Sequence, residues 1–157
     1  MLRILPLAGL IAALALGSCV SQRVDLEDGF AWSYQNLESE GPKLAYGAPF
    51  SDNVVLMMTC DAGADRARIS LPGGSSEAGL ILISGRTSAS LDGETVASPV
   101  AGHGLEVGTP LDARPMARFR RTGDLTLVDR GRTVPIDARG SERAAVKRFF
   151  KACRRQT

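Results

Sequence analysis

Residues 53–60 read NVVLMMTC. A half-buried strand alternates apolar and polar residues, whereas this run is apolar on both faces, which is typical of a strand in the middle of a sheet. We therefore expect a central strand here, with other strands pairing on either side of it. Its last residue, Cys60, is a candidate for closing the fold covalently.

Strand patterns lie on both sides of this segment. Toward the N-terminus, Phe30, Trp32 and Tyr34 alternate with smaller residues, and this period of two predicts a strand with one buried face. Toward the C-terminus, 66–71 alternates Ala, Ile and Leu with Arg and Ser, and a turn at 61–63 joins it to the central strand.

The segments 80–84, 87–91 and 94–98 are predicted to form an antiparallel meander. Gly85 permits the positive φ that a two-residue hairpin turn needs. The Asp-Gly pair at 92–93 is the strongest hairpin signal in the chain. Three consecutive strands are therefore expected in one sheet.

The stretch 99–108 holds three glycines and is expected to break the strand pattern. A short helix is predicted over 113–121. Asp112 is the expected N-cap of this helix, and Gly123 is suited to its C-terminal end.

A last hairpin and a terminal helix complete the chain. The segments 125–128 and 132–136 predict the hairpin, and Pro135 places its second strand at a sheet edge because proline has no N–H to donate. Ser141 is the expected N-cap of the terminal helix. Four residues spaced as i, i+3, i+4 and i+7 form its apolar stripe: Val146, Phe149, Phe150 and Cys153.

Together these elements predict one α+β domain over residues 30–157. It is mostly antiparallel β, a sandwich or a strongly curved sheet, with one short helix and a C-terminal helix packed on the sheet. The chain of 157 residues is 44% hydrophobic and 23% charged, which excludes a disordered or collagen-like protein. A formal net charge of +2 gives no indication of nucleic-acid binding.

Residues 1–18 have the composition of a secretory signal peptide. Arg3 is followed by an apolar run that is closer to 15 than to the roughly 20 residues that span a bilayer. The segment 19–29 is polar and acidic, without a periodic apolar stripe, so we expect a tether between this leader and the domain.

The end of the leader, Leu16-Gly17-Ser18-Cys19, resembles the lipobox of bacterial lipoproteins. The resemblance covers the signal alone. It implies that the Cys19 sulfur receives a diacylglycerol, that cleavage makes Cys19 the mature N-terminus, and that a third acyl chain such as palmitate follows. Two or three chains anchor durably, because each buried methylene contributes about 0.8 kcal/mol. The resemblance further implies a lipid-anchored protein facing the periplasm, and Val20 implies the outer rather than the inner membrane.

Two cysteines remain if Cys19 is acylated. Cys60 ends the central strand and Cys153 lies on the apolar stripe of the terminal helix, so both are expected to point into the core. Thiols in an oxidising compartment tend to form disulfides, and we predict that these two pair. The alternatives are two inert buried thiols or a catalytic thiol.

Charge is divided unevenly along the mature chain. Residues 20–112 hold 5 Lys and Arg against 13 Asp and Glu, whereas 113–157 hold 13 against 4. One interpretation is that the acidic strands neutralise the basic helices within the fold. The other is a basic interaction face toward anionic lipid, lipopolysaccharide or peptidoglycan carboxylates. Its candidate residues are Arg114, Arg118, Arg120, Arg121, Arg143, Lys147, Arg148 and Lys151.

No catalytic residue, cofactor site or metal site is predicted. The single histidine, His103, lies between two glycines and is expected to be an exposed loop residue. One imidazole with no companion does not build a zinc site. Sequence spacing in a β-rich chain does not reveal which carboxylates meet in space.

These patterns favour a non-catalytic cell-envelope lipoprotein that acts as a binding or interaction module. Its expected partners are membrane lipid through Cys19 and an envelope protein or peptidoglycan, with no nucleic acid. One alternative is a lysozyme inhibitor, because one such family comprises small periplasmic or lipid-anchored β proteins with a disulfide. The fragment at 84–86, Ser-Gly-Arg, resembles that family. Another alternative is a hydrolase with an unmarked carboxylate site.

Overall fold

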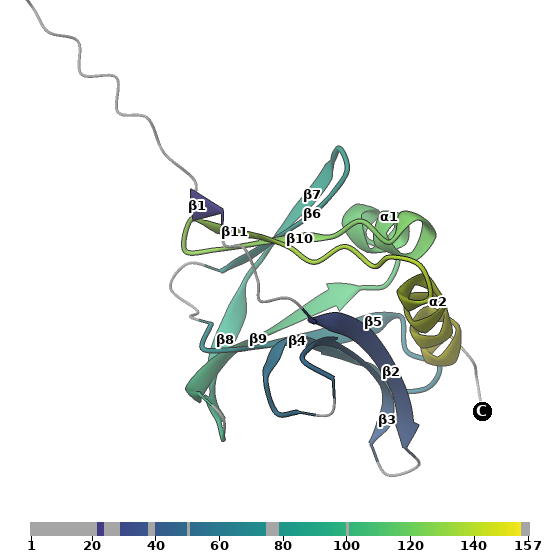
Figure 1. The fold of residues 1–157 in the computed structure, drawn as a ribbon, viewed down its shortest axis with the longest axis horizontal. Coiled ribbons are helices and arrows are strands. Elements are labelled where there is room, and N and C mark those ends of the chain that lie inside the picture. The colour runs from purple at the N-terminus through teal and green to yellow at the C-terminus, as the bar shows by residue number, and fades with distance from the viewer. Residues whose placement is uncertain are drawn as a thin grey trace, which may run out of the picture.

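Two sheets and two helices form the part of the chain that the structure describes (Figure 1). The described residues of this computed structural model are 22–23, 29–37, 40–49, 51–74, 79–99 and 101–154, with the backbone alone at 22–23. One sheet has six strands and the other has five. The predicted fold class, α+β and mostly antiparallel with a sandwich-like arrangement, is confirmed.

The six-stranded sheet has the order β2-β3-β4-β5-β9-β8. Its strands are β2 (Ala31–Leu37), β3 (Gly41–Gly47), β4 (Val54–Thr59), β5 (Arg66–Pro72), β9 (Gly102–Pro110) and β8 (Gly93–Ser98). β4 lies inside the sheet, as its sequence predicts. Leu56 and Met58 are fully buried, while Met57 on the opposite face is partly buried. The strand is therefore apolar on both faces, but only the face of Leu56 and Met58 is fully buried.

The five-stranded sheet has the order β1-β11-β10-β6-β7. Its strands are β1 (Gln22–Arg23), β11 (Arg132–Pro135), β10 (Thr126–Asp129), β6 (Leu80–Ser84) and β7 (Thr87–Leu91). The predicted hairpins β6–β7 and β10–β11 are confirmed. The edge position predicted from Pro135 is wrong, because β11 lies between β1 and β10; β1 pairs in parallel with Arg132 and Thr133, before Pro135 is reached.

The predicted third strand of the meander does not join the meander. β8 pairs with β9 in the other sheet, so the Asp-Gly pair at 92–93 marks the crossing between sheets rather than a hairpin turn. Gly93 has no positive φ. A Cβ on it would lie 2.3 Å from Val107 Cγ1, so this glycine is required for close strand approach.

The predicted break over 99–108 is also wrong. Residues 102–110 form β9, which pairs with β5 on one side and β8 on the other. Gly104 serves close packing, because its Cβ would lie 2.9 Å from the Leu71 carbonyl oxygen. His103 is exposed as predicted, although it lies in a strand and not in a loop.

Helix α1 (Arg114–Thr122) follows β9 and packs against β6 and β7. Gly123 ends it in the left-handed conformation, φ +83°, and its N–H donates to the Phe119 carbonyl oxygen at 2.8 Å. The predicted N-cap is wrong by one residue. Ala113 occupies that position without a side-chain hydrogen bond, and Asp112 is exposed.

Helix α2 (Glu142–Cys153) packs against β2, β3 and α1. Its predicted apolar stripe is buried in full. Ser141 is the N-cap residue, but its side chain makes no capping hydrogen bond. Instead the Glu142 carboxylate accepts a hydrogen bond from the backbone N–H of Arg139 at 2.8 Å.

The core between the layers is centred on Trp32. Its indole lies between the rings of Tyr46 and Phe119, with centroids 5.3 Å and 5.1 Å away. Its Nε1–H donates to the carbonyl oxygen of Ile136 at 2.6 Å. One side chain of the six-stranded sheet is thereby tied to the segment that leads from β11 to α2.

The predicted pairing of Cys60 with Cys153 is present as a disulfide, with Cα atoms 5.7 Å apart. The predicted leader, 1–18, and Cys19 lie outside the described residues. Of the predicted tether, 19–29, the described residues are Gly29 and the two residues of β1.

Candidate functional site

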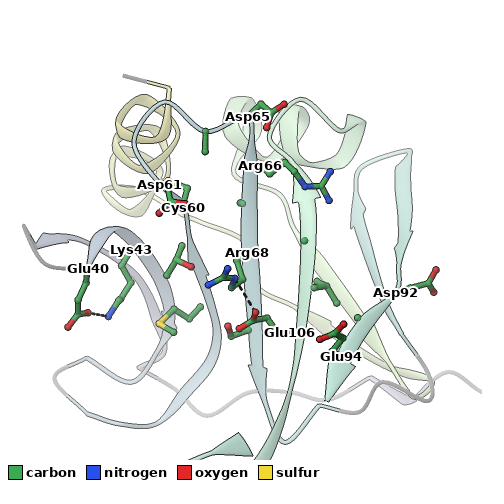
Figure 2. Close-up of a pocket in the computed structure, with 18 residues that line it drawn as sticks. Glu40, Lys43, Cys60, Asp61, Asp65, Arg66, Arg68, Asp92, Glu94 and Glu106 are labelled. Atoms are coloured by element: carbon green, nitrogen blue, oxygen red, sulfur yellow. Dashed lines mark hydrogen bonds and ion pairs between the residues drawn. The ribbon is translucent and has the colours of Figure 1, made fainter. Parts of the chain in front are cut away.

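The outer face of the six-stranded sheet carries a groove of about 890 Å³, which we call the sheet groove (Figure 2). Strand register explains its lining. One row across the sheet consists of Met57, Ser70, Glu106 and Glu94, and a second consists of Lys43, Thr59, Arg68 and Gly108. The polar residues that alternate with the buried core residues therefore form one continuous surface.

Four of the nine charged residues that line the sheet groove form ion pairs with one another. Arg68 Nε lies 3.0 Å from Glu106 Oε1, and Lys43 forms an ion pair with Glu40 (Figure 2). Glu94 lies directly opposite Glu106 across β8 and β9, an arrangement of like charges that disfavours pairing. The groove is thus a mixed surface with excess negative charge at the β8 side.

The hydrolase alternative requires catalytic carboxylates, so the solvent exposure of the carboxylates in the sheet groove is relevant to it. Glycosidases typically keep their general acid in an apolar, desolvated pocket. In the sheet groove Glu40, Asp61, Asp65 and Glu94 are exposed, and Glu106 is partly exposed and paired. Within the described part of the chain, no group of three or more His, Cys, Asp or Glu side chains is placed to hold a metal ion.

A second hollow, of about 530 Å³, lies between α1 and α2. We call it the cationic hollow. Its charged lining consists of Arg120, Arg121, Lys147, Lys151 and Arg154. Ala117 and the buried ring of Phe150 complete the lining.

Helical spacing brings these residues together. On α1 the lining residues follow the spacing i, i+3, i+4 from Ala117, and on α2 they follow i, i+3, i+4, i+7 from Lys147. The two stripes face each other because the helices are in contact, with the rings of Phe119 and Phe150 6.2 Å apart. The disulfide at Cys153 fixes the end of α2 beside this hollow.

The five cations of the hollow form no ion pair within the described residues. The ion pairs there are Lys43–Glu40, Arg68–Glu106, Arg130–Asp129 and Arg132–Asp129. Each joins two residues from the same half of the chain. Within the described residues, therefore, no ion pair joins the acidic first part of the chain to the basic helices.

The eight residues of the predicted basic face do not all lie on one surface. Arg120, Arg121, Lys147 and Lys151 meet in the hollow. They are joined by Arg154, which lies outside the predicted set although it continues the i, i+4, i+7 stripe of α2.

The remaining four predicted basic residues take other positions. Arg114 is exposed at the start of α1, and Arg118 covers Gly85, where a Cβ would lie 2.2 Å from the Arg118 Nε. Arg143 Nε donates to the Ala138 carbonyl oxygen at 3.4 Å, and Arg148 Nε to that of Ala144 at 3.3 Å.

The fragment at 84–86 lies at the β6–β7 turn. Ser84 is buried, with 1% of its surface exposed, and Gly85 lies beneath the Arg118 side chain. Arg86 is exposed. Of the three residues that resemble a lysozyme-inhibitor family, only Arg86 therefore has an exposed side chain.

Comparison with known proteins does not assign the chain to a family. No family model, curated protein or solved structure matches the chain. Among the described residues, neither helix has the length and apolar character that crossing a membrane requires.

Proposed function

We propose that the chain is a non-catalytic, lipid-anchored binding module of the bacterial cell envelope, and that it binds an anionic partner through the cationic hollow. One observation carries this proposal: Arg120, Arg121, Lys147, Lys151 and Arg154 surround one hollow without an ion pair in the described structure.

Helix dipoles explain only part of this arrangement. A cation in the last turn of a helix gains typically about 0.3–1 kcal/mol at an exposed site. Arg120 and Arg121 in α1 and Lys151 in α2 occupy such positions. Lys147 lies in the middle of α2 and has no such compensation. Its proximity to the other cations is unfavourable for folding and favourable for binding an anion.

The anchor and the disulfide support the envelope location. The Leu16-Gly17-Ser18-Cys19 sequence resembles a lipobox, and the bond between Cys60 and Cys153 is of the kind that persists in oxidising compartments. An outer-membrane location facing the periplasm is part of the proposal.

The anchor is tested by following maturation in cells. Globomycin, which blocks the lipoprotein signal peptidase, should cause the unprocessed precursor to accumulate, and Cys19→Ser should prevent incorporation of labelled palmitate. Normal maturation under the drug would refute the anchor.

The binding surface is tested with an immobilised polyanion, heparin, as the probe. K147Q/K151Q removes two charges from the hollow, whereas R114Q/R148Q removes two charges from the same helices outside it. We expect the first variant to elute at clearly lower salt than the second. Fewer cations of the hollow then hold the heparin, so a lower salt concentration is enough to screen their attraction. Equal elution of the two variants would show that net charge, not the hollow, governs binding.

A further inference from the structure

We infer that the cationic hollow faces away from the membrane that holds Cys19 and binds carboxylate groups of the peptidoglycan layer rather than lipid headgroups. This inference rests on the proposed lipid anchor and names the partner of the same site. The observation behind it is the position of β1 relative to the two helices.

β1 holds the start of the domain close to the anchor. Its first residue, Gln22, is three positions after Cys19, and an extended chain spans at most about 3.3–3.6 Å per residue. The backbone at Gln22 therefore lies within about 10 Å of the acylated residue. Because β1 pairs with Arg132 and Thr133, β11 is brought to the membrane with it.

The helices lie at the other end of the molecule. Figure 1 shows β1 on one side, α1 and α2 on the opposite side, and the strands between them. In the sheet order β1-β11-β10-β6-β7, three strand spacings of about 4.8 Å separate β1 from β6, against which α1 packs, so the hollow lies roughly 15 Å or more from β1. The Debye length at physiological salt is about 8 Å, so headgroup charge at the anchor acts only weakly on the hollow.

The chemistry of the hollow suits a carboxylate polymer. Arg120, Arg121 and Arg154 carry planar guanidinium groups that bind carboxylates through paired N–H donors. The cations of the hollow extend along two helices, so one polymer segment with repeated carboxylates engages several at once. Peptide stems of peptidoglycan carry such carboxylates and lie beyond the membrane surface. The module would then connect membrane and wall.

The test uses the mature acylated chain in phosphatidylcholine vesicles mixed with purified peptidoglycan sacculi. Sedimentation of the sacculi should carry vesicle lipid into the pellet. We expect R114Q/R148Q to behave as the unmodified chain and K147Q/K151Q to carry about five- to tenfold less lipid, since each exposed ion pair contributes about 0.2–1 kcal/mol. Sacculi whose carboxylates have been converted to amides should lose binding to the same extent.

Three outcomes would overturn the inference. Vesicles that have bound the acylated chain but stay in the supernatant, or binding that survives amidation, would exclude the wall carboxylates. Lysine-dependent binding of the unacylated Cys19→Ser chain to phosphatidylglycerol vesicles, without binding to sacculi, would assign the hollow to a lipid surface. Failure of the anchor is a separate result, because it appears in the globomycin experiment and as a chain that does not bind phosphatidylcholine vesicles before sacculi are added.

Discussion

The disulfide between Cys60 and Cys153 joins the residue after β4 to the last residue of α2, across 93 positions of sequence. Both cysteines are buried. A backbone hydrogen bond lies beside the disulfide: the Gly63 N–H donates to the Cys153 carbonyl oxygen at 2.7 Å. The end of α2 is thus fixed to the interior strand of the larger sheet by one covalent bond and one hydrogen bond.

Cys60→Ser should lower the stability of the domain markedly. A loop of this length contributes up to about 4.7 kcal/mol in the chain-entropy model, which is comparable to the whole stability of many small domains. We expect a large drop in the urea midpoint and in Tm, together with one more thiol reacting with Ellman's reagent, that of Cys153, than the unfolded unmodified chain shows.

Reduction provides the matched control for this variant. Dithiothreitol should lower the urea midpoint of the unmodified chain to near that of Cys60→Ser and leave the variant unchanged. Equal midpoints for the unmodified chain with and without reductant would contradict a stabilising disulfide.

Periodicity made much of the fold predictable from sequence. The alternation at Trp32 and Tyr34, the doubly apolar run that became β4, and the stripe of α2 each depend on a local pattern that burial imposes. The disulfide was predictable for the same reason, since both cysteines lie on buried positions of such patterns.

The predictions at 92–93 and 99–108 were wrong, although those for Gly85 and Gly123 are confirmed, because glycine has two different uses. Asp-Gly at 92–93 and the glycines of 99–108 indicated turns and a break, whereas Gly93 and Gly104 allow backbones and side chains of neighbouring strands to approach. Which use applies depends on the partner strand, and β8 pairs with β9 rather than with β7. Local sequence does not encode that partner.

Gly93→Ala should destabilise the domain through contact alone, because Gly93 has no positive φ. The new Cβ would lie 2.3 Å from Val107 Cγ1 and 2.4 Å from the Glu106 carbonyl oxygen, so β8 and β9 would have to separate. We expect a loss of about 1–3 kcal/mol in urea unfolding, the usual range for overpacking.

Gly102→Ala is the control for this effect. Gly102 has φ +75°, and no atom lies within 4 Å of the position that a Cβ would take, so it reports backbone strain without a clash. A left-handed backbone costs a non-glycine residue about 1–2 kcal/mol. Local hydrogen exchange should separate the two variants, with loss of protection along the β8–β9 ladder in Gly93→Ala. Unchanged protection there would contradict the close-approach role.

The candidate site was predictable in composition but not in geometry. The helical segments of the sequence contain the eight predicted basic residues, and the structure brings four of them together with Arg154. Arg118 was included because it is close in sequence to Arg120 and Arg121, yet the helix turns it toward Gly85. The sheet groove was not predicted at all, because its rows combine residues from five strands whose order follows from pairing.

Tyr46 should make stability fall at alkaline pH. Burial raises the pKa of its phenol above 10.0, the charges of Glu142 and Asp137 raise it further, and Arg139 lowers it. The folded state therefore holds the phenol proton more tightly than the unfolded chain does. This contribution is present in full below about pH 10 and is lost as the pH rises through the raised pKa.

Tyr46→Phe should reduce this alkaline dependence. The free energy of unfolding in urea, measured at about pH 8 and again at about pH 10.5, should fall less in the variant than in the unmodified chain. The comparison between the two proteins cancels the titration of the other groups. An identical decrease in both would mean that the Tyr46 phenol does not contribute.

K147Q/K151Q should leave the fold intact or stabilise it slightly, even though it weakens binding. Both side chains are exposed and lack an ion pair in the described structure, so the substitution removes repulsion among the cations of the hollow and, in return, only the helix-dipole interaction of Lys151. We expect a change within about 0.5 kcal/mol in urea unfolding, typical of surface substitutions. Added salt should stabilise the unmodified chain more than the variant, because screening removes the same repulsion. A clear loss of stability in K147Q/K151Q would instead assign these lysines to the fold and withdraw the main support for a binding surface.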